Sequence, residues 1–324
     1  MICRWLFRLQ IFGLFFFFRY LCNGAEWSYS DPNNGPDRWS QIPHSMCSGT
    51  YQSPIALSRA SSVFSPELKT IQIYRSGSTK TQNQIVNSGH SIVIQFPNDT
   101  WFVSFDGMFD KKYEVAQMHF HWGKDDERGS EHTIDGRTYP LEGHIVLFRR
   151  QIYPNIKAAE SAVGGLAVLG IMHSVVDTQN YNETIFSLYQ DFGGTLNPNF
   201  ALKQSYTIDE FDLAKVLTFL NPNRYYRYPG SLTTPPCTEN VLWTVFTDPV
   251  PVTRVQVNQL RGLPSPSTEK HTSLYDNFRP LQPLNPEGQL IPRVVYRAAA
   301  SSLPIQSLTS ILCIIAVTQF SLRF

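Results

Sequence analysis

The sequence predicts a mainly β (α+β) fold: one domain around a large sheet, with helices at its periphery. Apolar residues alternate with polar ones in seven short segments rich in β-branched and aromatic residues, which is typical of strands. Clusters of Gly, Asn, Asp and Pro separate these segments, and no linker, repeat or low-complexity tract interrupts residues 25–297. The predicted strands are residues 71–74, 91–96, 101–105, 116–122, 142–148, 167–172 and 242–246.

Helical signals are fewer than strand signals. Thr253 and Gln256 have the spacing of a capping box, which predicts a helix from there toward Arg261. Residues 182–190 and 209–217 are weaker helix candidates. The helices are therefore expected to decorate the sheet rather than to form a layer of their own.

The composition supports a folded domain and argues against a nucleic-acid partner. Hydrophobic residues make up 42% of the chain and aromatic residues 13%, which is ample for a core and excludes wholesale disorder. Lys and Arg together number 27 against 26 Asp and Glu, so the formal net charge is +1. A protein that binds phosphate backbones needs a basic face, and this balance does not indicate one.

Residues 1–24 have the pattern of a secretory signal peptide. Arg4 and Arg8 precede an apolar run at residues 9–18, and small residues near Gly24 offer a cleavage site. The alternative is a membrane-spanning anchor, for which this run is shorter than the roughly 20 residues that a span needs. Signal cleavage would place the mature chain in the secretory pathway.

The residues after the predicted domain, 298–324, have the pattern of a GPI-attachment region. Residues 298–302 are small, a weakly polar spacer follows, and residues 311–317 form a short apolar run. This order is typical of a tail that is removed and replaced by a lipid, which would hold the protein at the extracellular face of the plasma membrane. A short membrane anchor and a buried tail are the alternatives. The candidate attachment residues are Ala299, Ala300 and Ser301.

The cysteines agree with an exported chain. Of five cysteines, two lie in the predicted signal peptide and one in the predicted tail, which leaves Cys47 and Cys237. In an exported domain such a pair predicts one disulfide, and two buried free thiols are the alternative. Asn98 and Asn182 begin Asn-x-Thr sequons and are candidate N-glycan acceptors.

Three histidines on two predicted strands form a candidate metal site. His119 and His121 are two residues apart on one strand, so their side chains share a face. His144 lies two residues after Glu142 on another strand, and these two side chains also share a face. If the two strands pair antiparallel, the three imidazoles can meet above one face of the sheet.

A single histidine on a strand is more often a hydrogen-bonded structural residue than a metal ligand. Three on apolar strands favour a metal site, because burying imidazoles without partners costs several kcal/mol. Three neutral nitrogens without a thiolate suit zinc, and they leave the fourth tetrahedral position open for water, as in catalytic sites. Gln117 and Glu142 each stand two residues before a candidate ligand and could accept a hydrogen bond from its second nitrogen. The spacing does not decide which of them holds which histidine.

Several motifs resemble those of the α-class carbonic anhydrases, in the same order from Trp27 to Arg297. They are Gln-x-His-Phe-His-Trp-Gly at 117–123, Gly-Ser-Glu-His-Thr at 129–133, Glu-x-His at 142–144 and Tyr-Pro-Gly-Ser-Leu-Thr-Thr-Pro-Pro-Cys at 228–237. Cys47 and Cys237 match the disulfide of the extracellular members. The resemblance implies a single domain around a large, twisted, mostly antiparallel sheet. It also implies zinc-dependent, reversible hydration of carbon dioxide to bicarbonate and a proton by zinc-bound hydroxide, with sulfonamides as inhibitors.

The resemblance also assigns roles around the metal. Gln117 would orient one ligand, Glu142 would hold another, and the backbone carbonyl of Asn277 would receive the proton of the third. The ligands that these residues hold would be, in that order, His119, His144 and His121.

Substrate and proton handling follow from the same resemblance. Thr233 would accept a hydrogen bond from the hydroxide and pass its own proton to Glu131, and Thr234 would contact bicarbonate. His90 would shuttle protons, with Tyr29 helping to order a chain of water molecules. The apolar pocket for carbon dioxide would be lined by Val146, Val168, Leu232, Val241 and Trp243.

Three positions depart from the commonest pattern of the family. Gly143 stands where a bulkier apolar residue is usual, and its side points away from the metal, so we expect an effect on packing. Ser88 and Val93 differ from the residues usual near His90, which bears on proton transfer more than on zinc binding.

Two other functions are compatible with the same scaffold. A non-catalytic binding module is the alternative function, but members of that kind lack a ligand histidine and this chain has all three. A different zinc hydrolase, for instance an esterase, is expected only as a side activity of the same site.

Overall fold

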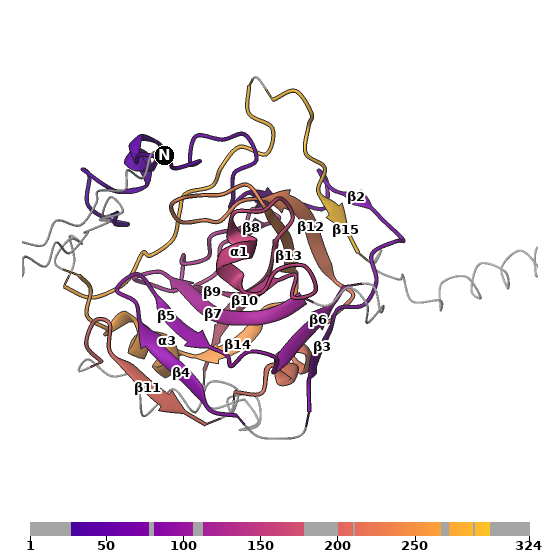
Figure 1. The fold of residues 1–324 in the computed structure, drawn as a ribbon. Helices are drawn as coiled ribbons and strands as arrows, with labels where there is room; N and C mark the ends of the chain where they lie inside the picture. Colours follow the sequence, from indigo (N-terminus) through magenta and orange to yellow (C-terminus); the bar gives the residue numbers. More distant parts are fainter. Residues whose placement is uncertain are drawn as a thin grey trace, which may run out of the picture.

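A computed structural model describes residues 27–77, 81–105, 113–177, 200–209, 211–266, 272–287 and 289–298 (Figure 1). Several predictions fall outside these residues and stay predictions. They concern the signal peptide 1–24, the tail from residue 299 onward with its three candidate attachment residues, the helix 182–190 and the glycan acceptor Asn182.

Strands dominate the described residues, as predicted. The strands are β1 (Ala56–Leu57), β2 (Val63–Phe64), β3 (Gln72–Arg75), β4 (Asn83–Asn87), β5 (Ile92–Gln95), β6 (Trp101–Ser104), β7 (Tyr113–Trp122), β8 (Thr133–Ile134), β9 (Leu141–Phe148), β10 (Leu166–Val176), β11 (Ser205–Ile208), β12 (Tyr225–Gly230), β13 (Val241–Phe246), β14 (Val250–Thr253) and β15 (Tyr296–Arg297). The helices are η1 (Pro36–Gln41), α1 (Ile156–Glu160), η3 (Leu213–Thr218) and α3 (Arg254–Arg261), where η marks a 3-10 helix.

Thirteen of the strands form one large sheet, whose main order is β11-β4-β5-β7-β9-β10-β13-β12-β15-β2. β14 pairs with β10, β6 pairs with β7, and β3 pairs with β6, while β1 and β8 form a separate pair. Most neighbours are antiparallel; β10 is parallel to β13 and β14, and β15 is parallel to β2. The predicted fold class is therefore confirmed, as is the mostly antiparallel character of the sheet.

All seven predicted strands are present, as β3, β5, β6, β7, β9, β10 and β13. The predicted capping box is also present: the Thr253 hydroxyl accepts from the backbone N–H of Gln256, whose side chain accepts from the Thr253 N–H. The candidate helix at 209–217 was placed too early. The Asp212 side chain caps Ala214, so the turn begins at Leu213 and is a 3-10 helix.

The centre of the sheet is buried on both faces, which positions the candidate site. Every residue of β9 is buried. Because side chains alternate, Ile145 and Leu147 join the larger apolar core on one face, whereas Val146 and Phe148 join a second cluster on the other. The candidate site therefore lies on a sheet whose opposite face is a dry core.

A disulfide joins Cys47 to Cys237, and the prediction of one bridge is confirmed. The two cysteines pack with the fully buried Trp39, and the backbone N–H of Met46 donates to the carbonyl of Pro236 at 2.7 Å. The amino-terminal segment is thereby tied to the loop that follows β12. Within the described residues, no helix is both long and apolar enough to cross a bilayer.

Gly143 makes room for a buried histidine on the core face of the sheet. A Cβ atom at Gly143 would lie 3.0 Å from Met118 Cε, 3.2 Å from His173 Cε1 and 3.3 Å from Phe120 Cδ1. A larger side chain would therefore clash with the ring of His173, and the expected effect on packing is the one observed. Burial of this ring lowers the pKa of His173 from 6.5 to about 4.

This pKa difference predicts an acid-sensitive contribution to stability. Between pH 6.5 and pH 4 the unfolded chain binds a proton at His173 that the folded chain does not. The free energy of unfolding should therefore fall by about 3 kcal/mol from this residue as pH drops through that window. Urea unfolding of wild type and of His173→Leu at several pH values measures it. The variant should lose less stability toward acid, and identical pH profiles would contradict the prediction.

Candidate metal centre

Two adjacent antiparallel strands bring the predicted ligands together. In the register of β7 with β9, His119 stands opposite His144 and His121 stands opposite Glu142. The other face of β7 carries Met118 and its apolar neighbours in the core. Period-2 alternation along both strands thus places the three imidazoles on one face, as the sequence predicts.

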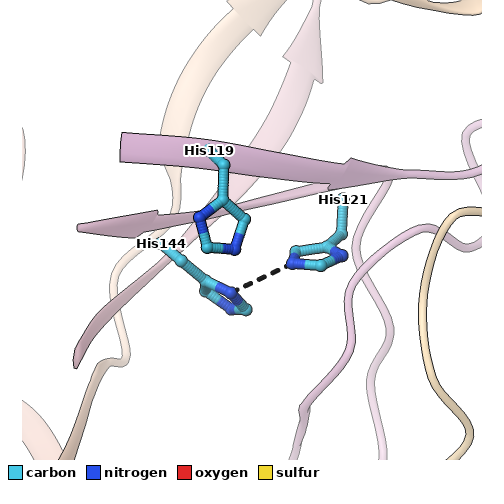
Figure 2. A group of neighbouring side chains, drawn as sticks. All are labelled: His119, His121 and His144. Atoms are coloured by element: carbon cyan, nitrogen blue, oxygen red, sulfur yellow. Dashed lines mark hydrogen bonds between the residues drawn. The ribbon is translucent and has the colours of Figure 1, made fainter. Parts of the chain in front are cut away.

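The three rings converge on one point (Figure 2). One ring nitrogen from each of His119, His121 and His144 lies within 4.8 Å of the others. Nε2 of His121 and Nδ1 of His144 are 3.1 Å apart, the contact drawn as a dashed line. His121 and His144 are each 1% exposed, whereas His119 is partly exposed, so the point of convergence is reached from the side of His119.

The second nitrogen of each ring faces a hydrogen-bond acceptor. Nδ1 of His119 lies 3.0 Å from Oε1 of Gln117. Nδ1 of His121 lies 2.7 Å from the backbone carbonyl of Asn277. Nε2 of His144 lies 2.8 Å from Oε1 of Glu142. The structure thus supplies the pairing that the sequence left open.

These acceptors determine the tautomers. A carbonyl or a carboxylate can only accept, so the facing ring nitrogen must carry the proton and donate it. Nε2 of His119, Nε2 of His121 and Nδ1 of His144 therefore keep a lone pair, and all three point to the same place. Three inward lone pairs, each backed by an acceptor, are the arrangement that protein sites use to bind a transition metal.

Burial also favours the neutral form of two of the three histidines, His119 and His121. It lowers the pKa of His119 well below its ordinary value, and the neighbouring His121 and His144 add to the effect. The pKa of His121 is likewise lowered by burial, against the pull of Glu131. Neutral imidazoles are the form that binds a metal ion.

Glu142 is the most heavily hydrogen-bonded carboxylate of the site. Its Oε1 accepts from His132 Nδ1 at 2.7 Å as well as from His144, and its Oε2 accepts from the backbone N–H groups of Glu131 and His132. Burial opposes ionisation, but attraction to His132 and the hydrogen bonds from both histidines outweigh it and hold the pKa of Glu142 well below its ordinary value. Glu142 is therefore a buried carboxylate anion.

Sequence reasoning missed two residues of this network. His132 Nε2 lies 2.6 Å from the hydroxyl of Tyr228, whose O–H donates to Ser53. Arg279 donates through its backbone N–H to Oε1 of Glu131 at 2.8 Å and through its guanidinium to Gln52 and Ser53. His132 stands inside a quoted motif, so its sequence signal was present. Arg279 stands in Asn-Phe-Arg-Pro-Leu-Gln-Pro-Leu at 277–284, which also resembles a motif of the same family, but its role was not predicted because its partners are far away in the chain.

Glu131 lies beside the ligands with one free acceptor. Its Oε1 is 3.5 Å from His121 Nδ1, and its Oε2 is 3.9 Å from His144 Nδ1. That Oε2 is buried and accepts no hydrogen bond from the described part of the chain. Thr233 is buried and Thr234 half-buried in the loop held by the disulfide, and no hydrogen bond joins the Thr233 side chain to Glu131.

The five predicted pocket residues gather in the apolar cluster beside His144. Val146 and Trp243 flank Val168 from the neighbouring strands, and the Trp243 ring centroid is 4.8 Å from that of His144. Val241 belongs to the same cluster, and Leu232 packs against it. One wall of the candidate site is therefore hydrocarbon.

The predicted shuttle residue His90 contacts the aromatic rings of Trp27 and Tyr29. Its ring stacks on Trp27 with centroids 3.9 Å apart, and the Tyr29 ring lies edge-on at 6.3 Å. The Asn277 amide donates to the His90 carbonyl at 2.8 Å, so one residue holds both this loop and His121. The Ser88 hydroxyl closes the turn by accepting from the Ser91 N–H.

The structure also describes two other positions that the sequence singled out, Val93 and Asn98. Val93 pairs with His119 across β5 and β7, which places it next to a ligand. Asn98 is exposed in the turn between β5 and β6, so its side chain is accessible to a glycan.

Comparison with known proteins identifies a family. The family model for eukaryotic-type carbonic anhydrases matches residues 34–288. The chain is 34% identical over 287 residues to carbonic anhydrase 6 of Homo sapiens, which covers 88% of this chain and 86% of that protein. It is 33% identical over 262 residues to carbonic anhydrase 6 of Bos taurus, and the match covers 80% of this chain and 78% of that protein. It is 32% identical over 262 residues to carbonic anhydrase 7 of Mus musculus, and the match covers 80% of this chain and 94% of that protein.

Proposed function

This chain belongs to the eukaryotic-type carbonic anhydrase family, enzymes that hydrate carbon dioxide, and from that premise we propose that it does so with zinc at the cell surface. The zinc ligands are His119, His121 and His144. The observation that carries the proposal is the convergence of three unprotonated nitrogens whose opposite nitrogens are all held by acceptors. When bound, zinc lowers the pKa of water to about 7, which supplies the nucleophile at neutral pH.

Thr233 and Glu131 orient the reacting groups. A threonine hydroxyl can accept a hydrogen bond from the nucleophile in a defined direction only if its own proton is committed elsewhere. The unfilled, buried Oε2 of Glu131 is an acceptor suited to that proton. Thr234, next in the loop, contacts the bicarbonate product.

The hydrocarbon wall suits a neutral substrate. Carbon dioxide has no charge and forms weak hydrogen bonds, so a polar pocket would bind water in preference to it. The side of the site next to His144 is lined by apolar side chains, which disfavour water there: Val146, Val168, Leu232, Val241 and Trp243.

Proton release runs through His90. Each turnover leaves a proton that must reach solvent, and a histidine with an ordinary pKa near 6.5 can carry it at neutral pH. The ring of His90 lies beside Trp27 and Tyr29. Asn277 links the His90 loop to the metal site, because its amide donates to the His90 carbonyl and its own carbonyl faces His121. Tyr29 helps to order the water that connects His90 to the metal.

The alternative, a non-catalytic binding module, is disfavoured because all three ligand histidines and their acceptors are present. Hydrolysis of activated esters is expected only as a side activity of the same nucleophile. Sulfonamides, which the family binds, are expected to inhibit this chain through the metal.

The catalytic domain spans residues 25–297 and acts outside the cell. Cleavage after residue 24 exports the chain, and a GPI lipid on Ala299, Ala300 or Ser301 replaces the rest of the tail. The disulfide and the exposed sequon at Asn98 agree with an exported protein.

Removing one ligand, His119, should reduce zinc affinity more than removing Glu142, the acceptor that holds another ligand, His144. His119→Ala should abolish zinc binding, carbon dioxide hydration and sulfonamide binding together. Glu142→Ala should weaken zinc affinity by about 10- to 100-fold, because the His144 tautomer is no longer fixed. Competition with a chelator measures the affinity, and Glu127→Ala, at an exposed position, is the control. Full hydration activity in the folded, zinc-free His119→Ala protein would overturn the proposed function.

His90→Ala should slow turnover by about tenfold or more in dilute buffer, and concentrated buffer should restore it by carrying the proton itself. Stopped-flow hydration at increasing buffer concentration measures this effect, with His44→Ala, at an exposed position, as control. An equal loss at all buffer concentrations would contradict the shuttle role.

Lipid attachment predicts enzymatic release from cells. A phosphatidylinositol-specific phospholipase should release the active protein from the surface of cells that express the full chain. Replacing Ala299, Ala300 and Ser301 by leucine should prevent attachment, since the attachment site needs small residues. A surface protein that the phospholipase leaves in place would show that the tail itself is the anchor.

A further inference from the structure

Four arginines line one small cavity that contains none of the predicted metal ligands. The cavity has a volume of about 250 Å³, and its lining includes Arg59, Arg137, Arg224 and Arg297. We call it the arginine pocket. Guanidinium groups in a concave site are suited to phosphate, because their planar donors match its oxygens two at a time.

Acidic residues only partly balance these charges. Asp135 is the one carboxylate in the described lining, and Asp248 pairs with Arg224 at 2.9 Å from just outside it. Four positive groups therefore face two negative ones. Like charges gathered at one place favour the binding of an anion.

The arginine pocket continues into an exposed apolar edge. Among the described residues, β2 is the last strand of the large sheet and pairs only with β15. Tyr296 stands beside Val63 on one face, where they are 41% and 53% exposed. Phe64 is 42% exposed and stands beside Arg297 on the face of the pocket. We call these two strands the β2–β15 edge.

An exposed edge strand with apolar side chains is normally covered by another part of the protein or by a partner surface. Unpaired backbone groups with exposed apolar side chains on both faces favour association with another surface. Leu290 and Ile291, in the segment that leads into β15, are also exposed, at 97% and 71%. Aromatic and apolar side chains next to arginines are the composition found at membrane interfaces.

The course of the chain indicates what covers this edge. Ala298 directly follows β15 and itself lines the arginine pocket. A GPI lipid on Ala299, Ala300 or Ser301 would be joined one to three residues after Ala298, a span of at most about 11 Å when extended. Membrane attachment at the tail would hold the β2–β15 edge close to the lipid headgroups.

We propose that the arginine pocket and the β2–β15 edge lie against the membrane, with the pocket binding the phosphate groups of anionic lipids. The proposal rests on the membrane attachment proposed above. Phe64, Val63 and Tyr296 enter the interfacial layer, and the arginines contact the headgroups. In Figure 1, β2 and β15 lie at the right of the view and the start of the amino-terminal segment lies at the left.

Hydrogen exchange on vesicles tests the proposal. The full chain, purified from cells in detergent, is incorporated into vesicles of phosphatidylcholine alone or mixed with phosphatidylserine, and the floated protein is analysed. Each basic residue near an anionic surface is worth about fivefold in binding, so exchange in residues 57–65 and 289–298 should slow at least tenfold on the mixed vesicles. Exchange in α1, which packs on β9 and β10, should not change.

Two charge-matched variants test whether the arginines cause the slower exchange on the mixed vesicles. Arg59→Gln, Arg137→Gln and Arg224→Gln combined should remove the protection while leaving carbon dioxide hydration and thermal stability unchanged. As a control, Lys157→Gln, Lys203→Gln and Lys215→Gln combined remove the same amount of charge from other exposed positions. This control variant should keep the protection from exchange on the mixed vesicles.

The outcomes separate this proposal from membrane attachment itself. Protein that floats with both vesicles but gains no protection on the mixed ones contradicts the arginine pocket alone. Protein that floats with neither contradicts both. Protection of the pocket by inorganic phosphate in the absence of anionic lipid, with no further effect of the lipid, would overturn the membrane assignment in favour of a soluble anion.

Discussion

Three hydrogen bonds that point away from the metal position determine what the histidines can do. Gln117, the Asn277 carbonyl and Glu142 each accept a proton from the outer nitrogen of one ring, so the inner nitrogens keep their lone pairs. Without these acceptors each imidazole could adopt either tautomer, and three neutral rings would form an ordinary buried cluster. With them, the protein is organised for a metal before the metal arrives.

A wider buried network keeps those acceptors in place. Glu142 accepts four hydrogen bonds, and through His132 it reaches Tyr228 on β12. A half-satisfied polar network would be less stable than an apolar core, so nearly every group here has a partner. The buried exception among the carboxylate oxygens of the site is Oε2 of Glu131, which is the atom proposed to accept a hydrogen bond from the Thr233 hydroxyl.

Much of this arrangement could be predicted from alternation along the strands, and the rest depended on contacts between distant residues. His119, His121 and His144 were placed on one face because side chains alternate every two residues. β4 was missed because its buried positions include Asn83 and Asn87, whose amide groups bind Phe211 and Phe200 rather than packing as hydrocarbon. The partners of Arg279 and the contact of Gly143 with His173 could not be predicted from their motifs, since these contacts exist only once remote segments pack together.

X-ray absorption at the zinc edge of the purified protein tests the metal site most directly. Three imidazoles and one water predict a first shell of four nitrogen or oxygen scatterers at about 2.0–2.1 Å, with outer-shell scattering from three rings. A sulfur shell at about 2.3 Å, or scattering from two or four imidazoles, would contradict the proposed coordination.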